Sequence, residues 1–156
     1  MSKKNVDLSE NFGPIQIAFL DNLKRLKNRQ CENVLVSVPI KKLKNGTLQF
    51  KKPLYCALGV ACLTASPSII EKGIDKAQKG LDSDDYEDND VLEPSIDIPK
   101  TVSSKLGFHG EDGAFINGDE YADYSSLVDM NDSGGSFLEI RDYIIKNPKV
   151  VFKTRK

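Results

Sequence analysis

The sequence is poor in the residue types that most often carry metal sites, catalysis and disulfide frameworks. It contains no tryptophan, a single histidine and only three cysteines. The odd, widely spaced set of Cys31, Cys56 and Cys62 is not typical of a secreted disulfide scaffold. No apolar stretch follows the polar start Met1–Asp7, and none approaches the roughly 18 residues that a membrane span requires. We therefore expect a cytoplasmic protein with reduced thiols and no membrane partner.

The sequence also lacks a large excess of either charge, because 22 basic and 23 acidic residues leave a net charge of −1. No global field therefore attracts the protein to nucleic acid or to a membrane. The distribution is uneven, since residues 1–53 carry 11 Lys and Arg against 4 acids, whereas residues 81–93 carry seven acids and no base. This composition predicts a hydrated acidic loop over residues 80–95.

The 156 residues fit one domain, which we place at 12–147 between a flexible N-terminus (1–11) and a basic tail (148–156). Apolar residues at helical spacing predict an amphipathic helix over 14–28, with Pro14 in its first turn. A β-branched run within 34–40 predicts a strand that Pro39 ends. The following Asn45-Gly46 pair predicts a hairpin with a type I′ turn, in which both central residues have positive φ.

The most apolar stretch, Cys56–Ala65, predicts an interior helix at the centre of the core. Further helices are expected over 68–79, 99–106 and 124–130, and a second Asn-Gly hairpin over 114–121. Ser136 and Glu139 form a capping box that opens a last helix, which ends at Asn147-Pro148. The fold class predicted is α+β: a single small domain with several helices packed on two short antiparallel β-hairpins.

Two motifs carry a resemblance to known proteins. One is the run Tyr-Cys-Ala-Leu-Gly-Val-Ala-Cys-Leu at 55–63. The other is Ser-Leu-x-x-Met-Asn-Asp-Ser-Gly-x-Ser-Phe-x-x-Ile-x-x-x-Ile at 126–144. Together they resemble a family of small, uncharacterised proteins of bacteriophages and some bacteria, whose members have Cys and Leu where this chain has Ala57 and Ala61. The resemblance implies a phage protein in the host cytoplasm and implies no particular chemistry.

A thiol at the start of a helix is the first candidate for chemistry. The helix dipole and free N–H groups lower the pKa of such a thiol, which makes it a better nucleophile. The order of candidate residues along the chain is that of papain-like enzymes: Cys56 comes first, then His109, then an acid or amide. We assign this third role to Asp119, with Asp112 and Asn131 as alternatives. The competing interpretation is a buried structural cysteine in an apolar helix.

The C-terminal motif is the second candidate. Its turn residues Asn131, Asp132, Gly134 and Ser136 are candidate binding residues, although a turn followed by a helix cap explains them equally well. The pattern beginning at Asp129 resembles an EF-hand loop but has Ile140 where the bidentate Glu belongs. Cys56 and Cys62 lie on different faces of a helix, so they match no zinc spacing. We predict no metal and no cofactor.

These observations favour a non-enzymatic phage-type accessory protein that interacts with an unknown host or phage protein. One alternative is a cysteine-dependent hydrolase or transferase that uses Cys56 and His109. Another is a small-ligand or nucleic-acid binding module that uses the basic N-terminal half. The two short helices around Gly134 suggest a helix-turn-helix, but the second helix has no basic excess, so we expect no nucleic-acid partner. The sequence leaves the oligomeric state open.

Overall fold

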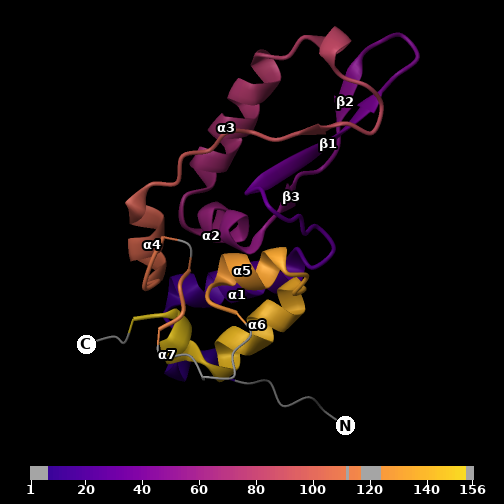
Figure 1. The fold of residues 1–156 in the computed structure, drawn as a ribbon. Helices are drawn as coiled ribbons and strands as arrows, with labels where there is room; N and C mark the ends of the chain where they lie inside the picture. The colour runs from indigo at the N-terminus through magenta and orange to yellow at the C-terminus, as the bar shows by residue number, and fades with distance from the viewer. Residues whose placement is uncertain (1–6, 112, 117–123, 154–156) are drawn as a thin grey trace.

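The structure is a computed structural model that describes residues 7–111, 113–116 and 124–153. It is a single α+β domain, as predicted, with a small antiparallel sheet (Figure 1). The strands are β1 (Val36–Lys42), β2 (Leu48–Phe50), β3 (Leu54–Tyr55) and β4 (Val91–Leu92). The helices are α1 (Pro14–Arg25), α2 (Ala57–Ala65), α3 (Pro67–Lys79), α4 (Lys100–Leu106), α5 (Leu127–Asp132), α6 (Phe137–Lys146) and α7 (Pro148–Val151), with short 3-10 helices at Leu8–Glu10 and Ser83–Asp85.

Helix α2 is the centre of the core, which confirms the prediction for this segment. Every residue from Ala57 to Cys62 is buried, and the helix packs against α1, α3, α4 and α5. A helix that is apolar on all sides has to be enclosed, because no face of it is compatible with water. Gly59 permits the closest approach, since a Cβ there would overlap the carbonyl oxygen of Leu35 in the segment that leads into β1. Small residues therefore let the helix lie directly against the sheet.

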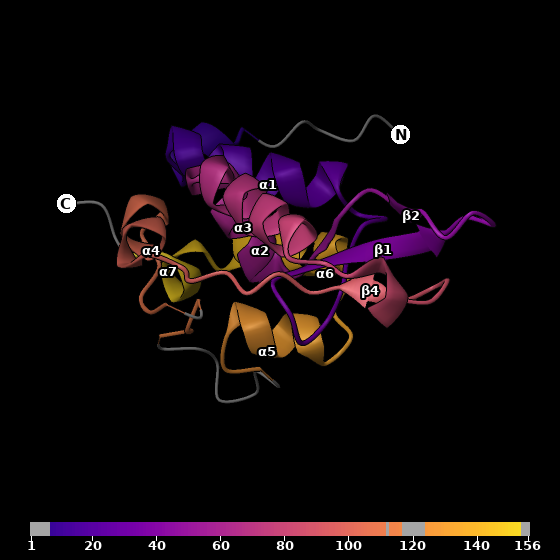
Figure 2. The same ribbon diagram turned by 90° about the horizontal axis from the view of Figure 1, so that it is seen from above.

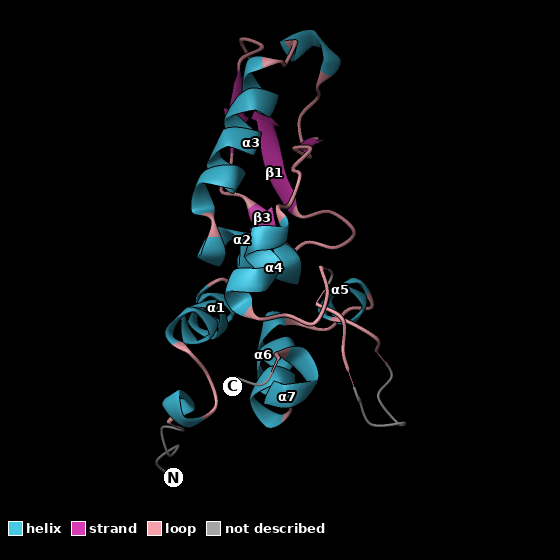
Figure 3. Ribbon diagram, turned by 90° about the vertical axis from the view of Figure 1, so that its left-hand side faces the viewer, coloured by secondary structure: helices cyan, strands magenta, loops and turns pink. Residues whose placement is uncertain are grey.

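Strand β1 pairs antiparallel with each of the other three strands. Its alternate residues Val36, Val38 and Ile40 are fully buried, as the pleat requires of a face that meets the core. In Figures 2 and 3, α3 lies on one side of this strand and α5 on the other.

The predicted end of the strand at Pro39 is wrong, because β1 continues to Lys42. Proline is tolerated there because β3 pairs with Val36 and Ser37 and β2 with residues from Ile40 onward, so that the absent N–H falls between the two pairings. The carbonyl of Pro39 still accepts from Lys51 N at 2.8 Å.

The Asn45-Gly46 hairpin between β1 and β2 is confirmed, but its turn is not type I′. Lys42 pairs with Leu48, so the connection comprises residues 43–47, and only Gly46 has positive φ, at 84°. The Asn45 Oδ1 atom instead accepts from Thr47 N at 3.0 Å. A longer connection with one left-handed residue satisfies the same sequence, because Asn and Gly favour both kinds of turn.

The acidic loop predicted over 80–95 is tied to the sheet rather than free in solvent. Its strand β4 pairs with Val38 and Pro39, and Leu92 is 5% exposed. The Lys42 ammonium donates to Tyr86 O at 2.9 Å, and its backbone N donates to Asp88 Oδ1 at 2.9 Å. Composition did not predict this attachment, because backbone pairing, one buried leucine and a few hydrogen bonds make it while the acidic residues stay exposed.

The helices at the other end of the molecule enclose an aromatic cluster. The Phe108 ring lies 5.8 Å from Phe19 and 5.5 Å from Phe152, and Phe12 also contacts Phe152. Residues 148–151, expected in the basic tail, form α7, and both Val151 and the following Phe152 are buried.

The turn of the second predicted hairpin, Asn117-Gly118, lies outside the described residues, although Ala114 pairs antiparallel with Ser126 beside it. No helix in the described part of the chain is long and apolar enough to cross a membrane.

Candidate functional site

The most highly connected polar side chain in the core is Asn131, in α5. It is 0% exposed, and its Oδ1 accepts from Gln30 Nε2 at 2.8 Å and from Ala57 N at 3.0 Å. Its Nδ2 donates to Cys31 O at 2.9 Å and to Asp132 Oδ1 at 3.1 Å. Both lone pairs and both N–H groups of the amide are therefore used. The backbone donor at Ala57 and the backbone acceptor at Cys31 fix which way round the amide lies.

Gln30 and Asp132 extend this network to the surrounding backbone. The Gln30 amide donates to Gly135 O at 2.7 Å and accepts from Phe137 N, the first N–H of α6, at 3.0 Å. Asp132 Oδ1 accepts from Asn33 N at 2.9 Å and so holds a residue with a positive φ of 65°. We call Gln30, Asn131 and Asp132 the amide cluster. It joins the loop before β1 to the starts of α2 and α6.

The predicted binding residues therefore meet in one place, where they have structural partners. Asn131 and Asp132 belong to the amide cluster, and Gly134 has the left-handed φ of 96° that the turn needs. The Ser136 hydroxyl accepts from Glu139 N at 3.2 Å and Glu139 Oε2 accepts from Ser136 N at 3.0 Å, which is the predicted capping box. Gln30 was not anticipated, because an isolated glutamine in a loop carries no sequence signal.

Cys56 occupies the expected position at the N-cap of α2, and it is buried. Its Sγ accepts from Gly59 N at 3.3 Å. Burial raises the pKa of the Cys56 thiol and outweighs the backbone N–H groups of Gly59 and Leu58, which lower it. The net effect is opposite to the activation expected from a helix N-terminus, because loss of hydration penalises the thiolate more than the nearby N–H groups favour it.

His109 follows α4, where its Nε2 lies 3.0 Å from Lys149 O on α7. No hydrogen bond joins Cys56 to His109 in the described part of the chain. Asp112 and Asp119, two of the candidate third members of the triad, lie outside the described residues. The third, Asn131, is held in the amide cluster.

Two hollows in the surface are lined by residues other than Cys56, His109 and Asn131. A hollow of about 410 Å³ separates α3 from the segment after β4, and its lining includes Gly73, Tyr86 and Leu92. A second, of about 210 Å³, lies between the 3-10 helix at Leu8–Glu10 and α7, beside Lys149. Among the described residues, no three His, Cys, Asp or Glu side chains are grouped so that they could hold a metal ion.

The oxygens of the EF-hand-like pattern are engaged locally. Asp129 Oδ2 accepts from Ser125 N at 2.9 Å, and the Asn131 amide is directed into the core.

Comparison of the chain with protein-family models, with curated proteins and with solved structures finds no match.

Proposed function

We propose that this chain is a non-enzymatic accessory protein that binds a partner protein through an arm of exposed charge. The arm consists of residues 41–52, which include the end of β1, the connection and β2, and of the neighbouring segment 82–93. It extends away from the helices α1, α5, α6 and α7 (Figure 1).

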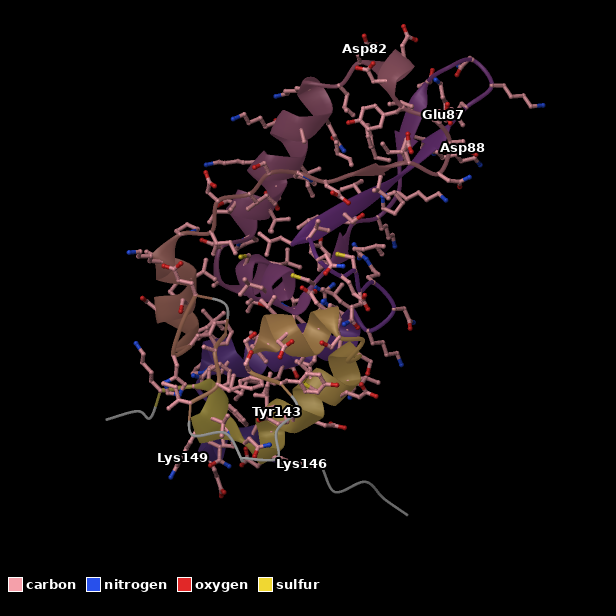
Figure 4. The ribbon with its side chains drawn as sticks, in the orientation of Figure 1. Asp82, Glu87, Asp88, Tyr143, Lys146 and Lys149 are labelled. Carbon is pink, nitrogen blue, oxygen red and sulfur yellow. The ribbon has the colours of Figure 1, made fainter. Side chains whose placement is uncertain are left out.

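The observation that carries this proposal is the unpaired charge of the arm. Among the described residues, the ion pair within 4.0 Å joins Lys79 to Asp75 on α3, and none joins the two halves of the arm. Figure 4 shows Asp82, Glu87 and Asp88 together at one end of the molecule. All seven acids of 82–93 are exposed, and so are most of the lysines of 41–52, which are Lys41, Lys42, Lys44, Lys51 and Lys52.

Exposed apolar side chains accompany this charge. Leu43 is 37% exposed in the hairpin connection and Val91 is 44% exposed on β4. Apolar side chains surrounded by charge are typical of an interface, in which the apolar part supplies affinity and the charge supplies orientation and association rate.

The cysteine-dependent alternative has less support. Burial raises the pKa of the Cys56 thiol, and the His109 ring is engaged by the backbone of α7. Neither feature favours thiolate formation at neutral pH. The cytoplasm of a bacterium infected by a phage remains the proposed setting, and its support is the pair of sequence motifs at 55–63 and 126–144.

Site-specific photo-cross-linking in a bacterial lysate tests the proposal. A photoreactive phenylalanine analogue replaces Leu43 or Val91 on the arm, and Leu138 on α6, which is 40% exposed, serves as the matched control. We expect one discrete adduct from the two arm positions that weakens as salt is raised, and none from the control. The same adducts from all three positions, or none from the arm, would refute the proposal.

Charge neutralisation then measures the contribution of the arm. Three exposed acids of the arm are replaced as D84N, D85N and E87Q, and the control neutralises three exposed acids elsewhere as D21N, E71Q and D142N. Exposed ion pairs contribute about 0.2–1 kcal/mol each, so the arm variant should bind the identified partner roughly tenfold more weakly. Equal losses in the two variants would show that net charge rather than the arm is responsible.

A further inference from the structure

We propose that Cys31 and Cys56 are a reversible disulfide pair, closed by exchange with a small disulfide such as oxidised glutathione. The inference does not depend on the proposed partner. It rests on the backbone geometry that places the two residues side by side and on the way the amide cluster holds both of them.

The first observation is a parallel backbone pairing. Tyr55 N donates to Arg29 O at 2.8 Å, and Cys31 N donates to Tyr55 O at 2.9 Å, so Gln30 and Tyr55 are bridge partners. The next residues along the two segments are Cys31 and Cys56. Paired segments lie about 4.7–4.9 Å apart at a bridge, and Cys31 and Cys56 are each one residue beyond this isolated one. That spacing falls within the Cα separation of about 4.4–6.8 Å found in disulfides.

The second observation is the side chain of Asn131, which is hydrogen-bonded to both of these segments. Its Nδ2 donates to Cys31 O at 2.9 Å while its Oδ1 accepts from Ala57 N, the residue after Cys56, at 3.0 Å. One planar amide thus bridges both cysteine segments. Because two sets of hydrogen bonds already hold the segments of Cys31 and Cys56, little further conformational entropy is lost when the two sulfurs are joined.

The two thiols differ in access, which assigns their roles. Cys31 is partly exposed, and its Sγ lies 3.5 Å from Val34 O, whereas Cys56 is buried. The Cys31 thiolate attacks one sulfur of the oxidant, so that its S–S bond breaks and a glutathione thiolate leaves. The Cys56 thiolate then attacks the Cys31 sulfur of the mixed disulfide and releases the second glutathione. Two protein thiols are oxidised, one disulfide is reduced, and the two protons pass to the leaving thiolates.

Cys62 provides an internal control. It lies six residues after Cys56, which corresponds to about 9 Å along a helix at a rise of 1.5 Å per residue. This exceeds the 7 Å beyond which two cysteines cannot be bridged without movement of the backbone.

The surroundings of the pair predict a slow reaction at neutral pH. Burial and the neighbouring Cys56 thiolate raise the pKa of Cys31 to about 12, and the carboxylates of Asp132 and Glu93 act in the same direction. Asp132 also raises the pKa of Cys56. Because the thiolate is the attacking species, the rate should rise about tenfold per pH unit between pH 7 and 10.

The test oxidises the reduced, folded full-length chain with oxidised glutathione or diamide, alkylates the remaining thiols and maps the products by mass spectrometry. We expect the loss of two hydrogen masses, one alkylated thiol at Cys62, and one cross-linked peptide pair that contains residues 31 and 56. C62S should behave in the same way, whereas C31S and C56S should form no intramolecular bond. Serine is a favoured N-cap residue, so C56S should still fold, and circular dichroism checks this.

Oxidation in urea serves as the reference, because an unfolded chain should give all three pairings. A Cys56–Cys62 bond in the folded chain, a stable glutathione adduct at Cys31 that never resolves, or a mixture of pairings like that in urea would each overturn the proposal. A rate that does not change with pH would overturn the assignment of Cys31 as the attacking thiolate.

Discussion

Replacing Asn131 with alanine should remove the polar connection between the loop before β1, α2 and α5. The variant loses four hydrogen bonds of 2.8–3.1 Å at a side chain that is 0% exposed. The partners left behind differ in their consequences. Ala57 N is a buried backbone donor at the start of α2 and has no alternative acceptor within the helix, whereas Gln30 keeps its bond to Gly135 O.

The magnitude follows from these partners. A typical intramolecular hydrogen bond contributes about 1 kcal/mol net, and a buried donor left unsatisfied costs about 1–3 kcal/mol. Counting the orphaned Ala57 N and the weakened contacts to Cys31 and Asp132, we expect a loss of about 3–5 kcal/mol. This is a large share of the roughly 5–15 kcal/mol by which domains are stable.

Urea unfolding followed by far-ultraviolet circular dichroism is the assay, because the chain has no tryptophan for fluorescence. Ser133→Ala is the control, since its hydroxyl makes only a 3.4 Å contact with Asp129 at the surface. The control should change the free energy of unfolding by less than about 0.5 kcal/mol. A loss below about 1 kcal/mol for Asn131→Ala would refute the argument that the amide cluster holds these elements together.

The stability of the Asn131→Asp variant should depend on pH. The new carboxyl would face Cys31 O and the Asp132 carboxylate, so burial and like charge should raise its pKa above the value of about 3.9 in the unfolded chain. A protonated carboxyl can still donate a hydrogen bond, so this variant should be closest to the parent below about pH 4. It should then lose stability relative to the parent as the pH rises through the raised pKa. The opposite pH trend would contradict the assigned orientation of the amide.

Three further expectations concern packing and titration. Gly59→Ala should destabilise the fold by more than about 3 kcal/mol, because its Cβ would overlap the backbone carbonyl of Leu35, whereas Gly134→Ala, at a positive φ but in open space, should cost about 1 kcal/mol. In β4, Leu92→Asp should cost about 2–4 kcal/mol and Val91→Asp less than about 0.5 kcal/mol, and equal effects would show that the acidic segment is not docked. Because burial raises the pKa of Cys31 from 9.0 to about 12, stability should fall as pH rises through that interval, and Cys31→Ser should reduce this alkaline loss in urea titrations.

Periodicity identified the elements whose burial pattern is set locally. The apolar run at 57–65 and the capping box at Ser136 led to α2 and α6, because an all-apolar helix has to be interior and a cap is satisfied within four residues. The same reasoning erred at Pro39 and in the acidic segment. In both places the outcome depended on which strand lay opposite, and local sequence does not contain that information.

In the candidate site, too, some features follow from local sequence and others from long-range contacts. The sequence by itself determined that Cys56 starts a helix and that a turn follows the next short helix, since helix caps and turns are local, although Asn131 and Asp132, predicted in that turn, are the last two residues of α5. Only the tertiary structure decided that Gln30 and Asn131, 101 positions apart, share a hydrogen bond, and that Cys31 N donates to the carbonyl of Tyr55, the residue before Cys56. It also decided that burial outweighs the helix terminus at the Cys56 thiol. Hydration and long-range contacts depend on how the whole chain packs, so no local pattern of residues can specify them.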